Sequence, residues 1–379
     1  MPNNILQKIH MVDTKGQYLK IKDQVDAAVL DVIDSTQFIG GPVVKRFQEN
    51  LEKFLGVNHV IPCANGTDAL QIALMTIGLK PEDEVIVPAF TYVATAEVIA
   101  LLSLKPVMVD VDPDTFNIDT ALLENALTEK TKAIVPVHLY GQCADMAPIM
   151  AFANKHNLYV IEDNAQAIGS TYTFPDGSKQ KAGTIGHIGC TSFYPSKNLG
   201  AYGDGGAMMC NDEKLAKALK MVANHGQSSR YYHDLVGCNS RLDAIQAAIL
   251  DIKLKYLNDY SSARNSAADF YDKAFANNPH LQTPGRAENS DHVFHQYTLR
   301  VKNGKRNELK EFLQEANIPS MIYYPVPLYK QKAYQEHWKK GEKLPATELL
   351  SDQVLSLPIH TEMNESILTY ICETVNSFF

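Results

Sequence analysis

Short apolar runs alternate with amphipathic segments through much of the chain, and this order restricts the folds that it can adopt. Seven runs have the apolar, β-branched composition of strands, and they cover residues 60–64, 84–88, 106–111, 133–139, 159–162, 190–194 and 207–210. Segments of helical periodicity lie between most of them. The pattern predicts an α/β fold in which helices cover both faces of a mainly parallel, seven-stranded sheet. Ligands of such sheets bind at the carboxyl ends of the strands.

Two amphipathic helices are expected before the first strand. Residues 19–33 form the first, residues 38–42 interrupt it, and the second follows. Their apolar faces consist of Val25, Val29, Val32 and Ile33 in the first helix and of Phe47, Leu51, Phe54 and Leu55 in the second. We interpret both faces as core packing. Helix N-caps are expected further along the chain at Asp119, Asp145 and Asp212.

The last third of the chain predicts a smaller domain. A long helix is expected over residues 241–260. It is followed by a strand at 295–301, a helix at 307–316 and an extended segment at 321–329. Residues 172–181 predict a hairpin or an exposed loop. The chain is therefore divided into an N-terminal helical segment (residues 1–45), a large domain (46–260) and a small C-terminal α/β domain (261–379).

The charge and the cysteines of this 379-residue chain argue against several classes of protein. The formal net charge is −8, and no long basic run is present, so nucleic acid is not an expected partner. The six cysteines are scattered without a C-x-x-C pair, which predicts neither a metal site nor a disulfide framework. The N-terminus lacks the apolar core of a signal peptide. The apolar window at 85–104 contains Pro88 and Glu97 and does not predict a membrane span. A cytoplasmic protein is expected.

A lysine in a glycine-rich turn is the strongest candidate for chemistry. Lys197 follows an apolar run, and upstream another apolar run ends in Glu162 and Asp163. A lysine that forms a Schiff base and an aspartate that pairs with a pyridinium nitrogen are the minimal set for pyridoxal phosphate. Because side chains alternate along a strand, only one of the two acids can face the ring. A solvated surface lysine and a solvated strand end are the plain alternatives.

A candidate anion site follows the first strand. Gly66, Thr67 and Asp68 open a helix, and the exposed N–H groups and the dipole of a helix N-terminus attract a phosphate. The hydroxyl of Thr67 is an additional donor. An ordinary turn with an N-cap is the alternative for this Asn-Gly-Thr sequence.

Five motifs occur in a fixed order: NGTDAL at 65–70, PAFTYVAT at 88–95, EDNAQ at 162–166, SFYPSK at 192–197 and GCNSRLD at 237–243. Through these motifs nearly the whole chain resembles the DegT/DnrJ/EryC1/StrS family of sugar aminotransferases, a branch of fold type I. The resemblance implies an aspartate aminotransferase-like fold and pyridoxal 5′-phosphate as the cofactor. It also implies that Lys197 forms the Schiff base and moves the proton, and that Asp163 pairs with the ring nitrogen.

The same resemblance assigns further residues to the cofactor. Gly66, Thr67 and Ser192 match positions that hold its phosphate. Tyr92 matches the aromatic residue that stacks on the ring, and Gln166 matches the residue beside the ring and its phenolic oxygen.

Other matched residues concern the substrate and a second subunit. Asn239 and Arg241 match residues that reach the neighbouring active site, Asn239 at the cofactor phosphate and Arg241 at an anionic group. A homodimer with shared active sites is therefore expected. A salt bridge from Arg241 to Asp243 or Asp251 is the plain alternative. His295, Tyr323 and Tyr324 are further candidates on the substrate side.

Residues 65–71, 139–145 and 205–206 most resemble the enzymes that aminate C3 of UDP-2-acetamido-2-deoxy-3-keto-hexuluronate. The resemblance implies amino transfer from L-glutamate to such a nucleotide-linked keto-sugar, for lipopolysaccharide O-antigen or capsule. A dTDP-linked 3-keto-6-deoxyhexose and a 4-keto sugar stay open as substrates.

Features of the sequence argue against three other functions. Lys197 and the lack of a cysteine cluster argue against a dehydratase of the same family. The intact set of site residues argues against a regulatory protein that kept the fold and lost catalysis. No G-x-G-x-x-G follows the first strand, which argues against a Rossmann dehydrogenase.

Overall fold

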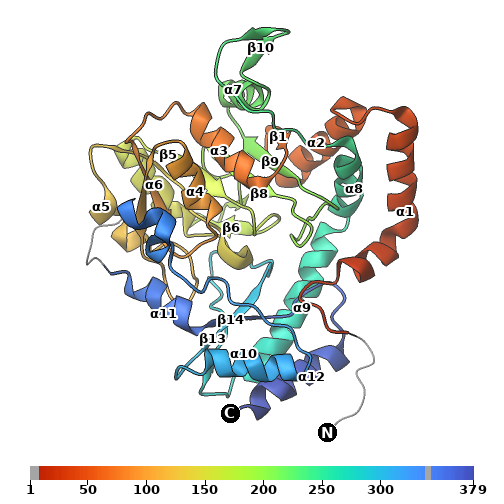
Figure 1. Ribbon diagram of the computed structural model, residues 1–379, viewed down its shortest axis with the longest axis vertical. Helices are drawn as coiled ribbons and strands as arrows, with labels where there is room; N and C mark the ends of the chain where they lie inside the picture. Colours follow the sequence, from red (N-terminus) through yellow and green to blue (C-terminus); the bar gives the residue numbers. More distant parts are fainter. Residues whose placement is uncertain (1–7, 338–342) are drawn as a thin grey trace.

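The computed structural model describes residues 8–337 and 343–379, and a seven-stranded sheet lies at its centre (Figure 1). The strands are β1 (His59–Cys63), β2 (Glu84–Pro88), β3 (Lys105–Val109), β4 (Thr131–Ile134), β5 (Tyr159–Asp163), β8 (Ile188–Ser192) and β9 (Gly206–Cys210). Their order in the sheet is β1-β9-β8-β5-β4-β2-β3. Strand β9 is antiparallel to both of its neighbours, and the other neighbouring pairs are parallel. The predicted sheet is confirmed.

Helices cover both faces of the sheet, because its strands are apolar on both sides. In β2, Val85 and Val87 point to one face and Ile86 to the other, which is the two-residue period of a strand. The first face packs on α3 (Gly66–Thr76), α4 (Ala94–Leu101) and α7 (Glu213–Ala223). The opposite face packs on α2 (Gly41–Leu55), α5 (Leu123–Ala126), α6 (Met146–His156) and α8 (Ala244–Leu254).

The fourth strand is shorter than predicted. The apolar run at 133–139 continues beyond β4, but the ladder between β4 and β5 ends at Ile134. Pro136 has no N–H group and cannot donate a ladder hydrogen bond. The chain turns soon afterwards in the short 3-10 helix η2 (Leu139–Gly141).

Helix α1 (Thr14–Ser35) lies along α8, and both predicted N-terminal helices are present (Figure 1). Ile21, Val25 and Val32 form its buried side. The prediction that Ile33 shares this side is wrong, since Ile33 is 45% exposed. Ile33 is one position beyond Val32, which turns its side chain by about 100° around the helix axis.

The three predicted N-cap residues occupy N-cap positions, and two of them make the cap hydrogen bond. Asp119 accepts a hydrogen bond from the N–H of Ala121 at the start of η1 (Thr120–Leu122), and Asp212 accepts one from Leu215 at the start of α7. Asp145 occupies the predicted N-cap position of α6, but within the described residues its side chain makes no cap hydrogen bond. Its carboxylate instead accepts hydrogen bonds from the hydroxyl of Tyr172 and from Nδ2 of Asn289.

The C-terminal part of the chain has its own core. An antiparallel sheet of β12 (Leu281–Gln282), β13 (Tyr297–Val301) and β14 (Val354–Leu357) packs with α9 (Leu257–Phe275), α10 (Arg306–Glu315) and α12 (Glu365–Ser377). Helix α11 (Pro345–Gln353) lies before β14. The extended segment predicted at 321–329 contains only the start of the short 3-10 helix η3 (Leu328–Lys330), which η4 (Lys332–His337) follows.

The single helix predicted over residues 241–260 is wrong, because α8 ends at Leu254 and α9 begins at Leu257. Each helix packs on a different core: α8 on the large sheet and the second half of α9 on the C-terminal core. Helix α9 thus continues through the predicted domain boundary at residue 260. The division into residues 1–45, 46–260 and 261–379 stays a prediction.

Two hairpins lie outside these cores. The predicted one consists of β6 (Thr171–Thr173) and β7 (Lys179–Lys181). The other, β10 (Gln227–Ser229) and β11 (Tyr232–His233), projects from the top of the view in Figure 1. It has no alternating apolar pattern, because most of its residues are exposed.

Over residues 8–337 and 343–379, no helix is both long and apolar enough to cross a bilayer. The same ranges contain no group of three or more His, Cys, Asp or Glu residues arranged to hold a metal ion. Five of the six cysteines are buried, and all six are free thiols.

Asp110 connects the edge of the large sheet to α11. Its buried carboxylate follows β3 and accepts hydrogen bonds from the N–H groups of Ala346 and Thr347 and from the Thr347 hydroxyl, at 2.7–2.9 Å. Because Asp110 is only 5% exposed, water cannot readily replace these bonds.

Asp110→Ala should therefore lower the free energy of unfolding by about 1–3 kcal/mol, because it leaves buried donors without an acceptor. Urea unfolding followed by circular dichroism measures this change. Asp23→Ala, at an exposed position of α1, is the matched control and should alter stability by less than about 0.5 kcal/mol. Equal effects of the two substitutions would contradict the role of Asp110.

Candidate active site

The carboxyl ends of four strands lie at the same edge of the sheet. Strands β1, β8, β5 and β2 run in the same direction, because β9 is antiparallel to both β1 and β8 and the other pairs are parallel. Gly66 follows β1, Tyr92 follows β2, Asp163 ends β5 and Lys197 follows β8. The fold therefore brings these predicted residues to one edge.

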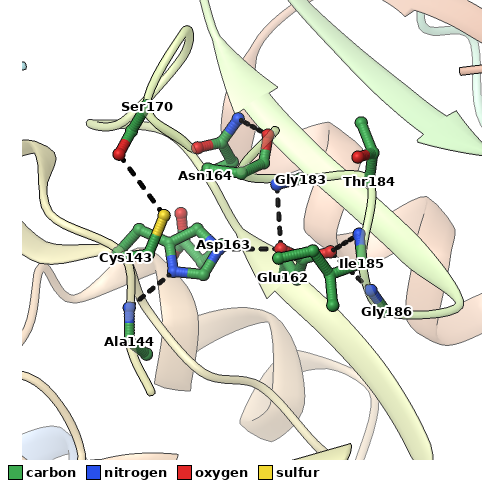
Figure 2. Close-up of polar contacts among 12 residues, drawn as sticks. Cys143, Ala144, Glu162, Asp163, Asn164, Ser170, Gly183, Thr184, Ile185 and Gly186 are labelled. Carbon is green, nitrogen blue, oxygen red and sulfur yellow. Dashed lines mark hydrogen bonds and ion pairs between the residues drawn. The ribbon is translucent and has the colours of Figure 1, made fainter. Parts of the chain in front are cut away.

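The two acids at the end of β5 point to opposite faces of the sheet. Glu162 shares the face of Val160, and Asp163 shares the face of Ile161. Glu162 is fully buried, and Figure 2 shows it among hydrogen-bond donors. Its carboxylate accepts bonds at 2.6–2.8 Å from the N–H groups of Gly183, Ile185 and Gly186.

His138 is the fourth partner of Glu162. Its Nδ1 accepts a hydrogen bond from the N–H of Ala144 (3.0 Å), so Nε2 carries the proton and donates it to the Glu162 carboxylate (2.8 Å). Glu162 is thus bound inside the protein and is not available to a ligand at the edge of the sheet.

Asp163 faces the site, and its carboxylate accepts two hydrogen bonds. Its Oδ2 accepts a hydrogen bond from the hydroxyl of Thr95 on α4 (2.8 Å), and its Oδ1 accepts one from the N–H of Ala165 (3.2 Å). Burial raises the pKa of Asp163, and the bonds from Thr95 and Ala165 and the charge of Lys197 oppose this rise. A cationic N–H group placed beside Asp163 would be held strongly.

Lys197 lies in a tight turn after β8. A Cβ atom on Gly200 would lie 2.4 Å from the carbonyl oxygen of Pro195, so only glycine allows this turn. Burial lowers the pKa of Lys197 to about 8, and the Asp163 carboxylate partly opposes this shift. Within the described residues its ammonium forms neither a hydrogen bond nor an ion pair. The amine is therefore available as a nucleophile near neutral pH.

The N-terminus of α3 provides free donors next to Ser192. Asn65 caps the helix by accepting a hydrogen bond from the N–H of Asp68 (2.8 Å). The N–H groups of Gly66 and Thr67 have no acceptor in the described part of the chain. A Cβ on Gly66 would lie 2.7 Å from Cβ of Ser192, so glycine lets the helix begin against that serine. This arrangement fits a phosphate group.

The rings of Phe90, Tyr92 and Tyr324 form an aromatic wall near Asp163. Gln166 donates from Nε2 to the hydroxyl of Tyr324 (3.2 Å) and accepts from the N–H of Tyr140 (2.7 Å). The ring of Tyr324 lies 6.0 Å from that of Phe90 and 6.1 Å from that of Tyr92, between ring centroids. Tyr92 is 55% exposed, so its ring is open to a planar ligand.

The C-terminal part contributes His295 and Tyr323. His295 is buried, and its Nδ1 has no partner within the described ranges. Burial and the nearby charges of Lys197 and Arg264 hold the pKa of His295 well below its ordinary value, so its imidazole is neutral. Tyr323 is half-buried, and its carbonyl accepts a hydrogen bond from the hydroxyl of Tyr140.

Asn239 and Arg241 are not joined to Lys197 of the same chain by any hydrogen bond or ion pair among the described residues. Both side chains are exposed. Between them, Ser240 donates to the carboxylate of Asp68 (2.6 Å), so this segment lies beside the N-terminus of α3.

The predicted salt-bridge alternative for Arg241 is not formed. Asp251 pairs with Arg46 instead (2.8 Å), and within the described ranges Arg241 forms no ion pair with Asp243. Nη2 of Arg241 instead lies 3.5 Å from Nε2 of His225. The guanidinium is thus free to bind an anion outside this chain.

Sequence reasoning assigned no role to Thr95 or His138. Thr95 ends the motif at 88–95 and lies at the start of α4. Its place in that motif was the sequence signal that could have indicated a role in the site. His138 is 24 residues from Glu162 in the sequence, and no local pattern marks their contact. It depends on the pairing of the chain segments around β4 and β5.

The chain is similar to known proteins over nearly its whole length. The sequence profile of the DegT/DnrJ/EryC1/StrS aminotransferase family matches residues 19–376. The UDP-2-acetamido-2-deoxy-3-oxo-D-glucuronate aminotransferase of Pseudomonas aeruginosa is 44% identical over 97% of this chain and 100% of its own. A protein of Geobacillus stearothermophilus named pleiotropic regulatory protein is 43% identical over 98% of each chain.

Solved structures extend the comparison to three dimensions. A DegT DnrJ EryC1 StrS aminotransferase from Brucella abortus has a TM-score of 0.91 and 41% identity, over 98% of this chain and 99% of that one. The protein ntda of Bacillus subtilis, solved with bound cofactor PMP, has a TM-score of 0.89 and 30% identity, over 99% and 86% of the two chains. The family depends on pyridoxal phosphate. Lys197, Asp163 and the open N-terminus of α3 fit that cofactor.

The lowered pKa of Lys197 predicts how cofactor uptake depends on pH. Cofactor-free protein should take up pyridoxal phosphate covalently at a rate that rises about tenfold per pH unit below pH 8 and levels off above it. The reason is that only the neutral amine attacks an aldehyde. Stopped-flow absorbance measures the rate. Lys197→Ala should abolish the absorbance change, and a midpoint near 10.5, the ordinary lysine value, would contradict the prediction.

Proposed function

The chain belongs to the DegT/DnrJ/EryC1/StrS aminotransferase family, and on this basis we propose that it transfers the amino group of L-glutamate to C3 of a UDP-linked 2-acetamido-2-deoxy-3-keto-hexuluronate. The observation that carries the proposal is the position of Lys197 beside Asp163, with the free N–H groups of Gly66 and Thr67 at the same edge of the sheet. The relative from Pseudomonas aeruginosa, named for such a substrate, supports the choice of sugar.

Pyridoxal phosphate, when bound, supplies an aldehyde carbon that reacts with amines and a ring that withdraws electrons. Lys197 would hold the cofactor through Nζ, and Asp163 would hold a proton on the ring nitrogen. The N–H groups of Gly66 and Thr67 and the hydroxyls of Thr67 and Ser192 would bind the phosphate.

Lys197 would also move the proton. Nζ would take the proton from the α-carbon of L-glutamate and would later return one to the sugar carbon that becomes aminated. The lowered pKa supports this role, because a substantial fraction of the amine is neutral near pH 8. An arginine could not serve here, since it stays protonated.

The aromatic wall would orient the reactants. The exposed ring of Tyr92 would cover the cofactor ring, while Gln166 and Tyr324 hold each other at its side. His295 is neutral and has an unpartnered Nδ1, so it would offer a hydrogen bond to the substrate without adding charge.

We assign Asn239 and Arg241 to the active site of a second subunit. Both are exposed, and within the described residues Arg241 contacts His225 and no acid. Asn239 would bind the cofactor phosphate of the partner subunit, and Arg241 an anionic group of its cofactor or substrate. The functional unit would be a homodimer with two shared sites.

The aminated nucleotide sugar would serve lipopolysaccharide O-antigen or capsule synthesis. Because the reaction consumes L-glutamate and a nucleotide sugar, we place it in the cytoplasm.

L-Glutamate alone, without a sugar, should remove the visible absorbance band of the holoenzyme, because the amino group leaves glutamate and stays on the enzyme. Lys197→Ala cannot form the band, so its half-reaction is followed as conversion of L-glutamate to 2-oxoglutarate. It should be slower by about 10²- to 10⁴-fold, the usual contribution of general acid–base catalysis. Lys214→Ala, at an exposed position, is the control and should react like the wild type. Turnover by Lys197→Ala at the wild-type rate would contradict the mechanism.

The identity of the sugar is tested after glutamate treatment. UDP-linked and dTDP-linked 3-keto sugars and a 4-keto sugar are added in turn, and mass spectrometry detects the aminated product. Amination of a dTDP sugar alone would overturn the UDP assignment. A band that persists with glutamate would indicate another donor or a dehydratase. No band after adding pyridoxal phosphate would favour a regulatory function.

A mixed dimer tests the shared sites. One subunit carries Lys197→Ala, and the other carries Asn239→Ala together with Arg241→Ala. Each homodimer should be impaired, whereas the purified heterodimer should recover about half of the wild-type activity, because one of its two sites combines only intact residues. Failure to recover activity in a stable heterodimer would remove the claim of shared sites.

A further inference from the structure

Side chains of α8 form hydrogen bonds with the backbone of the turn that carries Lys197. Helix α8 lies beside α1 in Figure 1. Lys253 donates from Nζ to the carbonyl of Gly200 (2.5 Å), and Gln246 accepts at Oε1 from the N–H of Tyr202 (2.8 Å). Gln246 and Lys253 are seven residues apart, about two helical turns, so they lie on one side of α8.

Lys253 is an unusual residue for this position, because it is only 1% exposed. Within the described residues, no ion pair to an acid involves it. Its Nζ lies 5.2 Å from the centroid of the Tyr202 ring, whose face attracts a cation. Burial and the charge of Arg264 lower the pKa of Lys253 to about 7.

Burying a lysine amine without a carboxylate is costly, because the group either stays charged in the interior or gives up its proton. An apolar side chain of similar volume would fill the same space without that cost. The presence of a lysine here therefore indicates that the hydrogen bonds donated by its Nζ have a function. The acceptor it holds, the Gly200 carbonyl, belongs to the turn that contains Lys197.

Further contacts hold the same turn. The N–H of Ala201 donates to the carbonyl of Phe193 (2.7 Å), which closes the loop around Lys197. Gly203 lies against Gln246, where a Cβ would come within 2.9 Å of Nε2. Asn198, next to Lys197, also donates from Nδ2 to the carbonyl of Val293 (2.8 Å), so α8 is one of two elements that fix the position of the turn relative to the sheet.

We propose that Lys253, assisted by Gln246, is a positioning residue that fixes the turn carrying Lys197 and so determines where the Lys197 amine meets the cofactor and the substrate. Lys253 acts through the Gly200 carbonyl and does not touch the reacting atoms. The inference rests on the proposed function, since it takes Lys197 as the reacting lysine.

Lys253→Met tests this inference, because methionine keeps an unbranched apolar stem and removes the donor. The glutamate half-reaction of the holoenzyme should slow by about tenfold to a hundredfold, the cost of a small displacement of a reacting group. The pH midpoint of the visible absorbance band should shift, while KM for L-glutamate should change by less than about twofold. A purely structural role would lower the melting temperature and leave the rate and the midpoint unchanged, which would overturn the inference.

Lys255→Met is the matched control, because Lys255 is exposed two positions further along the chain. It should behave like the wild type, and an equal effect of both substitutions would overturn the specific role of Lys253. If Lys253→Met does not fold, Gln246→Met is measured in its place. It should slow the half-reaction in the same direction, and a wild-type rate and midpoint would overturn the inference.

The wild-type protein separates the two proposals. Absence of the visible band and of the glutamate reaction in the wild type would overturn the proposed function and this inference with it. A normal wild-type band together with unaffected variants would overturn only the positioning role of Lys253.

Discussion

Two acids stand side by side at the carboxyl end of β5, and the protein must bury both. It does so by directing them to opposite faces of the sheet, as the period of a strand requires. Glu162 receives three backbone N–H groups and the His138 imidazole, so its charge is balanced within the fold. Among the described residues, Asp163 receives only the Thr95 hydroxyl and one N–H group, which leaves it able to bind a cationic partner. The geometry of the site depends on this separation.

Lys197 is the buried basic group of the same site. Burial destabilises its charged form and lowers its pKa to about 8, while Asp163 pulls the pKa in the opposite direction. The amine therefore stays charged in part and neutral in part near physiological pH, as a nucleophile and proton carrier requires. Its position comes from a separate set of contacts, since the turn is closed by its own backbone and held by α8.

Much of the fold could be predicted because burial on both faces leaves a direct pattern in the sequence. The strands appear as short apolar runs, and the motif residues follow their ends. The features that were not predicted involve contacts that a local pattern does not encode. Asp145 has the sequence position of an N-cap but bonds to Tyr172, which folds back onto it from β6. The break between α8 and α9 is unmarked by proline or glycine and reflects packing on two different cores.

The sequence by itself determined the α/β architecture, the family, and Lys197 with Asp163 as the central pair, because side-chain period and motif order are local properties of a chain. Only the tertiary structure decided that Glu162 turns into the protein, that Thr95 and His138 support the two acids, and that the buried Lys253 holds the turn of Lys197. These partners are far apart in sequence. Their distances exist only once the strands have paired and the helices have packed on the sheet.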